Sequence, residues 1–326
     1  MAGAERPWRV DLFASLPHYA DHLWPIWLAL DDDQRGDSWA THSTWWGSRR
    51  RPSYQPPAGT VTLVASWRDA LAVAPAPVIY VEHGAGQTYV DLAGHPSYSG
   101  GDHGRANVIG YVCPSTTVAA RWAGAPACAV GCPKLDRQLV ERREPDPRTL
   151  VITWHWNAHV NAESRPAWRH YERTIGGQVA RWQSQGWQVV GHGHPRSKAL
   201  MQSWWRDLGV STCFDAAEVL DHAALLIADN TSLMYEAAAL GRRVLALNAP
   251  WYRRDVEHGL RFWSHVPGWQ IDGPAELASI DLASYVDDDP SAQLRDRAVD
   301  HVYAFTDGHS AMRAAQFITA TIGDQR

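Results

Sequence analysis

Residues 223–248 read AALLIADNTSLMYEAAALGRRVLALN, and this stretch decides the fold class. Its first six residues form an uncharged apolar run, which is typical of a parallel strand covered on both faces. A polar turn at 229–232 follows, then a helical pattern that Gly241 closes, and then a second apolar run at 243–247. This order of strand, turn, helix and strand predicts an α/β protein with a parallel sheet.

The same alternation extends along the chain and divides it into two halves. A charged, proline-containing stretch, ERREPDPR at 141–148, separates them. We therefore expect doubly wound domains at 1–145 and 146–305, with a final helix within 306–326 that packs back on the first domain. The strands expected are 9–14, 61–66, 78–81, 108–113, 149–154, 187–191, 225–228 and 243–247. The main helices expected are 19–30, 67–72, 167–185, 197–208 and 232–240.

The composition excludes several classes of protein. Of 326 residues, 45% are hydrophobic and 20% are charged, with a net charge of −5, so a mostly disordered chain is excluded. No apolar run approaches the roughly 20 residues that a membrane-spanning helix needs. The first residues contain no apolar signal segment, and the four cysteines form no Cys-x-x-Cys pair. We therefore expect a reduced, cytoplasmic protein.

Tryptophan and histidine are unusually frequent, with 18 and 16 residues. Codon bias in a chain rich in Ala, Arg and Gly is one explanation. The other is function, because flat aromatic faces stack on sugars and bases. The acidic net charge predicts no general attraction to nucleic acid, although a local basic patch would supply one.

The polar turn after the first apolar run is the strongest local signal. Its residues are Asp229, Asn230, Thr231 and Ser232. Hydroxyls and free backbone N–H groups at a helix start bind anions, and the helix dipole adds to this. Glu236 lies one turn further on, within reach of a ribose if a nucleotide diphosphate occupies the helix start. The alternative is that Thr231 or Ser232 only caps the helix.

This stretch resembles the C-terminal domain of GT-B glycosyltransferases, nearest to the branch with CDP-glycerol glycerophosphotransferases and UDP-N-acetylglucosamine 2-epimerases. In those families a strand ends in Asp and small residues, and the helix that follows carries an acidic residue and the pattern A-x-x-x-G-[KR]-P-V. Arg243 stands here in place of the usual Pro. The resemblance implies two Rossmann-like domains facing across a cleft. It also implies a diphosphate bound by Thr231 and Ser232 and a ribose bound by Glu236.

Four further stretches follow the order of the family's motifs. HPR at 194–196 resembles the His-Pro that faces the donor phosphates, and VEHG at 81–84 resembles the loop with a catalytic His in glycerophosphotransferases. GCPKLD at 131–136 resembles the G-x-P-[KR]-x-D before the interdomain linker, and VITWHW at 151–156 takes the place of the family's TxHR strand. The donor-binding residues that the resemblance implies are His194, Arg196, Asp229, Asn230, Thr231, Ser232, Glu236, Lys134 and His155.

Transfer from an activated donor needs a base for the acceptor hydroxyl and positive groups for the departing diphosphate. His83 is the first candidate base because it follows an apolar strand, precedes a glycine-rich loop and has an ordinary pKa near neutrality. His18, after the first expected strand, is the second candidate. Asp102 or Asp91 in the long loop could orient a His or bind the acceptor. A hydrogen-bonded structural role is the alternative for His83.

The sequence predicts no metal site, and no cofactor beyond a nucleotide-activated donor that is itself a substrate. His192 and His194 form a His-x-His pair with no nearby Cys or acidic ligand, which is a poor zinc signature. No Asp-x-Asp motif stands at an expected strand end. GAGQT at 84–88 lacks the third glycine of a dinucleotide-binding fingerprint.

We therefore predict a metal-independent GT-B enzyme that transfers a sugar, or a polyol phosphate, from a nucleotide-activated donor to an acceptor hydroxyl. One alternative is an enzyme like UDP-N-acetylglucosamine 2-epimerase. Glu82 and His155 match an acidic residue and a His of that family, but Trp156 replaces its Arg.

A nucleic-acid acceptor is a further alternative. Trp45 and Trp46 precede three consecutive arginines, Arg49–Arg51, and such a stretch can stack on bases and pair with phosphates. This would suit a phage-type glycosyltransferase that modifies a hydroxylated base in DNA, whereas a solvated basic loop is the simpler interpretation. A non-catalytic binding protein of the same fold is the last alternative.

Overall fold

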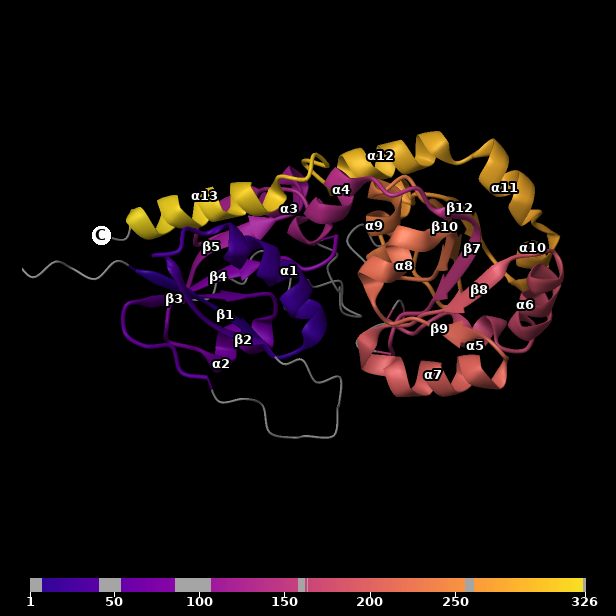
Figure 1. Cartoon of the computed structure of the whole chain (residues 1–326), viewed down its shortest axis with the longest axis horizontal. Coiled ribbons are helices and arrows are strands. Elements are labelled where there is room, and N and C mark those ends of the chain that lie inside the picture. The colour runs from indigo at the N-terminus through magenta and orange to yellow at the C-terminus, as the bar shows by residue number, and fades with distance from the viewer. Residues whose placement is uncertain are drawn as a thin grey trace, which may run out of the picture. The chain divides into compact units, whose positions relative to one another are not determined.

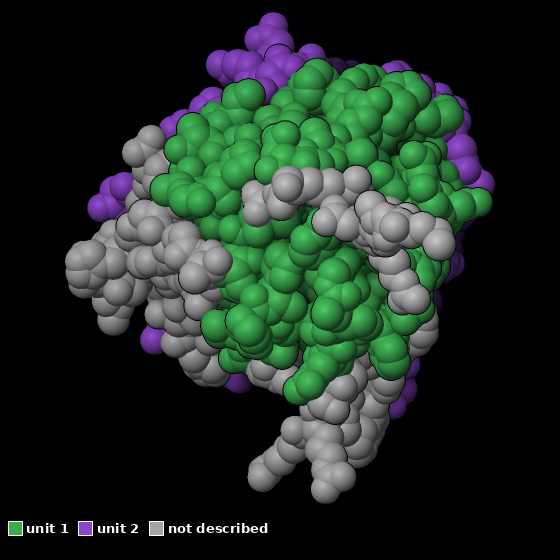
Figure 2. All heavy atoms as spheres, turned by 90° about the vertical axis from the view of Figure 1, so that its left-hand side faces the viewer, with its two compact units in different colours: residues 1–86, 98–140, 302–326 green, residues 87–97, 141–301 purple. Residues whose placement is uncertain are grey.

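The computed structural model describes residues 8–40, 54–85, 107–157, 162, 164–255 and 261–324. The chain forms two compact units, which Figure 2 shows in different colours. Unit 1 comprises residues 1–86, 98–140 and 302–326, and unit 2 comprises residues 87–97 and 141–301. Each unit has its own six-stranded parallel sheet with flanking helices (Figure 1). The predicted α/β fold class is therefore confirmed.

The sheet of unit 1 has the strand order β2-β1-β3-β4-β5-β6. Its strands are β1 (Arg9–Ala14), β2 (Arg35–Ala40), β3 (Thr60–Val64), β4 (Val78–Val81), β5 (Val108–Cys113) and β6 (Ala127–Ala129). The helices around it are α1 (Pro17–Ala29), α2 (Trp67–Ala72), α3 (Thr116–Ala119), η1 (Pro133–Leu135), α4 (Asp136–Glu141) and α13 (Ser310–Gly323). All five residues of β3 are buried, because helices cover both faces of the sheet.

The C-terminal helix α13 belongs to unit 1. It packs against α1 and β5 (Figure 1). Ala314 and Ile318 lie in the same apolar cluster as Leu12 of β1. Gly110 of β5 permits the close approach, since a Cβ at that position would lie 3.2 Å from the Phe317 ring. Helix α13, near the C-terminal end, thus contributes to the same hydrophobic core as β1.

The sheet of unit 2 has the strand order β12-β11-β10-β7-β8-β9. Its strands are β7 (Asp146–Thr153), β8 (Gln188–Gly191), β9 (Ser211–Thr212), β10 (Ala223–Ala228), β11 (Arg243–Leu247) and β12 (Trp269–Ile271). The helices are α5 (Trp168–Tyr171), α6 (Ile175–Ser184), η2 (Pro195–Ser197), α7 (Lys198–Asp207), α8 (Ala216–His222), α9 (Leu233–Ala239), η3 (Trp263–His265), α10 (Pro274–Ser279), α11 (Leu282–Asp288) and α12 (Ala292–Val302). β10, the run that decided the fold class, lies inside the sheet with all six residues buried.

One expected helix is wrong. The stretch at 167–185 forms two helices, α5 and α6, instead of one. The first helix ends at Tyr171. The Tyr171 hydroxyl donates to the carbonyl oxygens of Asn248 and Ile271, each at 3.0 Å. The Thr174 hydroxyl then donates to the Tyr171 carbonyl, which ends the first helix. A tertiary contact to two distant strand ends has therefore overridden the local helical pattern.

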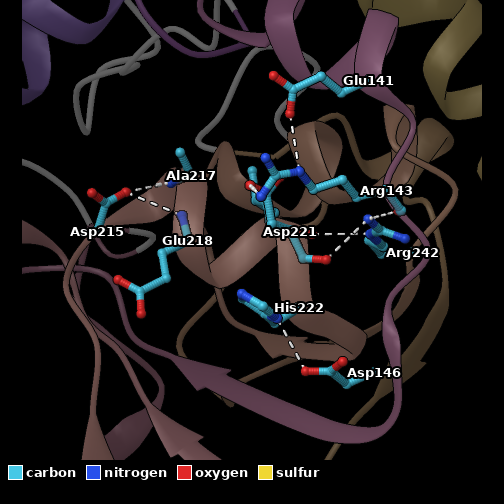
Figure 3. Close-up of polar contacts among 10 residues, drawn as sticks. Glu141, Arg143, Asp146, Asp215, Ala217, Glu218, Asp221, His222 and Arg242 are labelled. Carbon is cyan, nitrogen blue, oxygen red and sulfur yellow. Dashed lines mark hydrogen bonds and ion pairs between the residues drawn. The ribbon is translucent and has the colours of Figure 1, made fainter.

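The beginning of unit 2 is held by Arg242, at the turn between α9 and β11 (Figure 3). The buried guanidinium donates from Nε to the Leu220 carbonyl at 3.0 Å, and from Nη2 to the carbonyls of Arg143 at 2.7 Å and Asp221 at 3.3 Å. One side chain thus joins the segment 141–146 to the end of α8.

In the part of the chain that the structure describes, no helix is both long and apolar enough to cross a membrane. All four cysteines lie within the described residues, and none of them forms a disulfide.

Candidate functional site

In unit 2 the candidate donor-binding residues gather at the carboxyl ends of three adjacent strands. β10, β7 and β8 are neighbours in the sheet. Asp229 follows β10, His155 follows β7 and His194 follows β8. Because parallel strands end at the same edge of a sheet, the three loops meet there, where open α/β sheets bind ligands.

Asp229 ties these loops to one another. Its carboxylate is fully buried; Oδ1 accepts the backbone N–H of His155 at 2.7 Å, and Oδ2 accepts that of Ala167 at 2.8 Å. Burial raises the pKa of Asp229 to about 6, and these two hydrogen bonds limit the rise. Because both oxygens already accept backbone N–H groups, the geometry favours a role in positioning the loop after β7.

His194 and Arg196 present polar groups at the same edge. The Arg196 guanidinium lies 4.3 Å from the centre of the Trp156 ring, and the His194 Nδ1 accepts the Arg196 N–H at 3.1 Å. The rings of His155 and His194 are 5.5 Å apart. Burial first, and the Arg196 charge in addition, lower the pKa of His155 to about 4, so His155 is neutral near pH 7. Arg196 carries the permanent positive charge of this group.

At the start of α9, Thr231 and Ser232 differ in their hydrogen bonds. The Thr231 hydroxyl oxygen accepts the N–H of Leu233 at 3.3 Å, so Thr231 caps the helix. The Ser232 side chain makes no capping hydrogen bond, and its hydroxyl lies 3.5 Å from the carboxylate of Glu236. Asn230 and Glu236 are each 1% exposed, whereas Thr231 and Ser232 are partly exposed. Because α9 has only seven residues, side chains matter more here than the helix dipole.

A buried arginine that the sequence analysis did not identify lies near this edge of the sheet. Arg261 is fully buried; it donates to the Leu247 carbonyl at 2.8 Å and to the side-chain oxygen of Asn248. Asn248 follows β11 and donates in turn to Asp272 at 2.6 Å. Burial lowers the pKa of Arg261, and nearby Asp229 opposes this. The only signal that could have found the network is the position of Asn248 directly after a strand.

His192 is held by hydrogen bonds within the core of unit 2. Its Nδ1 shares a hydrogen bond of 2.6 Å with the Thr153 hydroxyl, and its carbonyl accepts the indole N–H of Trp205. Among the described residues, no group of three or more His, Cys, Asp or Glu side chains is arranged to hold a metal ion.

In unit 1 the structure brings the two candidate bases together. His83 follows β4, and His18 lies in the first turn of α1. The ring of Tyr19 contacts both, with centroid distances of 4.2 Å to His18 and 5.0 Å to His83. His83 is partly exposed, although its Nδ1 is buried.

His22, which the sequence analysis did not single out, completes this group. It is 5% exposed and its ring lies 6.3 Å from that of His83. Burial first, and then electrostatic interaction with Lys134, His83 and His18, lower the pKa of His22 well below 6.5. Lys134, predicted to bind the donor, thus lies near the candidate bases in unit 1. The i, i+4 spacing from His18 is the signal that could have found His22.

Glu82, which directly precedes His83 in the chain, is a buried acidic residue. It is 8% exposed, and burial raises its pKa to about 8, although Arg121 opposes the rise. Glu82 is therefore mostly protonated at pH 7. The thiol of Cys113 lies near it, and burial followed by the Glu82 charge raises the pKa of Cys113.

We expect the free energy of unfolding of unit 1 to fall as the pH rises from 6.5 to 8. The folded state raises the pKa of Glu82 from 4.5 to about 8, so ionisation above the unfolded value costs stability. His22 has the opposite effect, but only below its unfolded pKa of about 6.5. Above that pH the expected slope is about 1.4 kcal/mol per pH unit, or about 2 kcal/mol over the interval.

Urea unfolding of the wild type and of Glu82→Gln across this pH range measures the effect. Glu82→Gln removes the ionisation and should flatten the slope, whereas Glu172→Gln, at an exposed position, should leave it as it is. An unchanged slope in Glu82→Gln would show that Glu82 does not titrate in this range.

Several candidate residues lie outside the described residues, so their predictions stay open. These are Asp102 and Asp91 of the long loop, and the aromatic and basic stretch with Trp45, Trp46 and Arg49–Arg51.

No family model and no curated protein sequence matches the chain. Solved structures do. The wall teichoic acid polymerase TagF is 14% identical with a TM-score of 0.61, and the match covers 99% of this chain and 90% of that one. The UDP-GlcNAc 2-epimerase of Methanocaldococcus jannaschii, in complex with UDP-GlcNAc and UDP, is 12% identical with a TM-score of 0.54. That match covers 96% of this chain and 99% of the epimerase.

Together with the two parallel sheets, these likenesses show that the chain has the GT-B fold, as predicted. Both neighbours are enzymes by name. A shared fold hosts different reactions, so the function of this chain has to be argued from its own side chains.

Proposed function

We propose that the protein is a GT-B transferase that moves a sugar, or a polyol phosphate, from a nucleotide-activated donor to an acceptor hydroxyl. Unit 2 binds the donor and unit 1 supplies the base. The observation that carries the proposal is the placement of His194 and Arg196 after β8 and of Ser232 after β10, at the carboxyl edge of the second sheet on either side of the loop after β7.

These groups suit a departing diphosphate. Arg196 keeps its charge at all physiological pH values, and its guanidinium presents several N–H donors to phosphate oxygens. Ser232 adds a hydroxyl, and His194 adds a ring whose Nδ1 accepts the Arg196 N–H, which leaves Nε2 as the donor of the neutral ring. Such fixed donors stabilise charge that develops on a leaving group, with no metal required by the proposal.

The base in this proposal is His83. His83 is a partly exposed residue of unit 1, and its ring lies next to the buried Tyr19. A neutral imidazole can take the proton of an acceptor hydroxyl as the new bond forms, and the leaving nucleotide departs with the negative charge. His18 is the second candidate because it contacts the same tyrosine.

A panel of nucleotide-activated donors, assayed for the nucleotide released, tests the reaction class. Nucleoside diphosphate released from a sugar donor supports glycosyl transfer, and nucleoside monophosphate released from a CDP-linked donor supports phosphotransfer. Epimerisation of UDP-N-acetylglucosamine without an acceptor would support the second candidate, which the protonated Glu82 favours because it could donate a proton. No reaction and no nucleotide binding would overturn the proposal.

We expect Ser232→Ala to weaken the binding of UDP or CDP by about 1–3 kcal/mol, the cost of a lost hydrogen bond to a charged group. That corresponds to about 5- to 150-fold in Kd, which calorimetry measures. Ser184→Ala is the control, because Ser184 lies on α6 and donates to its own helix at Arg181. Affinity unchanged in Ser232→Ala would refute the location of the donor site.

A further inference from the structure

His22 makes a hydrogen bond that bears directly on the conformation around His83. Its Nε2 accepts the backbone N–H of Gly84 at 3.3 Å, and both groups are buried. Gly84 has a φ of +69°, in the left-handed region that residues other than glycine rarely adopt. The bond therefore joins α1 to the turn in which the chain leaves β4, directly after His83.

The same hydrogen bond determines which ring nitrogen of neutral His22 carries the proton. A ring nitrogen that accepts a hydrogen bond carries no proton, so the neutral ring has its proton on Nδ1. The titratable groups that face His22 are Lys134 of η1, His83 after β4 and His18 of α1, and a positive charge on any of them acts against a positive charge on His22. Burial acts in the same direction, which keeps Nε2 available as an acceptor at neutral pH.

We propose that His22 is a positioning residue for His83: it holds the Gly84 N–H and thereby fixes the direction in which the His83 ring leaves β4. This inference rests on the proposed function, in which His83 is the base. Tyr19 contributes from the same helix, since its ring packs edge-on against His83 at 5.0 Å. One face of α1 thus supports the reactive side chain at two points.

Two substitutions separate the hydrogen bond from the packing. His22→Phe keeps a ring but has no acceptor. His22→Gln keeps an amide oxygen at about the reach of Nε2 and cannot take a charge. His222→Gln is the matched control, because His222 lies on α8 of unit 2 and pairs there with Asp146 (Figure 3).

The first readout does not depend on any reaction. Amide exchange at Gly84, followed by NMR on the full chain, should be about 10-fold faster in His22→Phe than in the wild type. His22→Gln should restore most of the protection, and His222→Gln should match the wild type. Equal protection of Gly84 in His22→Phe and the wild type would overturn the proposal.

The second readout is turnover with the donor and acceptor found by the panel. His22→Phe should lower kcat by about 10- to 100-fold, because a small displacement of a reacting group has effects of this size. The Kd for UDP or CDP should stay within about 2-fold, since donor binding belongs to unit 2. Normal kcat in His22→Phe would also overturn the proposal. If the wild type itself transfers nothing, the proposed function fails, and the exchange at Gly84 still decides whether His22 holds the turn.

Discussion

His83→Ala should lower kcat by about 10²–10⁴-fold, the usual range for the loss of a general base. The affinity for UDP or CDP should stay nearly the same, because the proposed function assigns donor binding to unit 2 and only the acceptor proton to His83. Steady-state rates with the substrates from the panel, together with calorimetry of nucleotide binding, measure both quantities on the same protein.

His309→Ala is the control for this experiment. His309 is exposed at the start of α13, in the same unit as His83, and lies outside the candidate site. A kcat near the wild-type value in His83→Ala would show that His83 is not the base. The next variant to measure is then His18→Ala, because His18 contacts the same tyrosine.

Asp229→Ala should lower the free energy of unfolding of unit 2 by about 2–6 kcal/mol. The substitution leaves the N–H groups of His155 and Ala167 buried without their acceptor, and each such group costs about 1–3 kcal/mol. Removal of a buried charge with a raised pKa offsets part of this cost. Urea unfolding, with amide exchange at the two freed N–H groups, measures the loss.

Asp215→Ala is a matched control for the effect of burial. Asp215 also accepts two backbone N–H groups, from Ala217 at 2.9 Å and Glu218 at 3.1 Å, but it does so at the exposed start of α8 (Figure 3). Its loss should cost about 1 kcal/mol, as for an ordinary helix cap. Equal costs for the two substitutions would contradict the role of Asp229 as the buried tie between loops.

The central strands could be predicted from the sequence, and the edges could not. β10 is a continuous apolar run because both of its faces are covered. Its burial on both faces can therefore be predicted from its sequence. β2 reads RGDSWA and is half exposed at the edge of its sheet, and β9 has two residues. Such strands are held by backbone pairing with a neighbour, which leaves no hydrophobic pattern to detect.

The candidate site could be predicted to a similar degree. His83, His194 and Asp229 each follow an apolar strand, and that position alone indicates an edge where ligands bind. Arg261 and His22 were missed because their environment is made by residues distant in the chain. The Arg261 guanidinium donates to the carbonyl of Leu247 at the end of β11. His22 accepts a hydrogen bond from Gly84, which lies 62 residues further along the chain.

The packing of α13 has a consequence for biosynthesis. Unit 2 is nearly continuous in the chain, whereas unit 1 needs residues 302–326, which leave the ribosome after unit 2. Domains fold as units during synthesis, so the C-terminal half can fold before the N-terminal half is complete. Until α13 emerges, α1 and β5 keep exposed the apolar surface that Ala314 and Ile318 later cover. The nascent N-terminal half therefore exposes apolar surface of the kind through which incompletely folded chains aggregate.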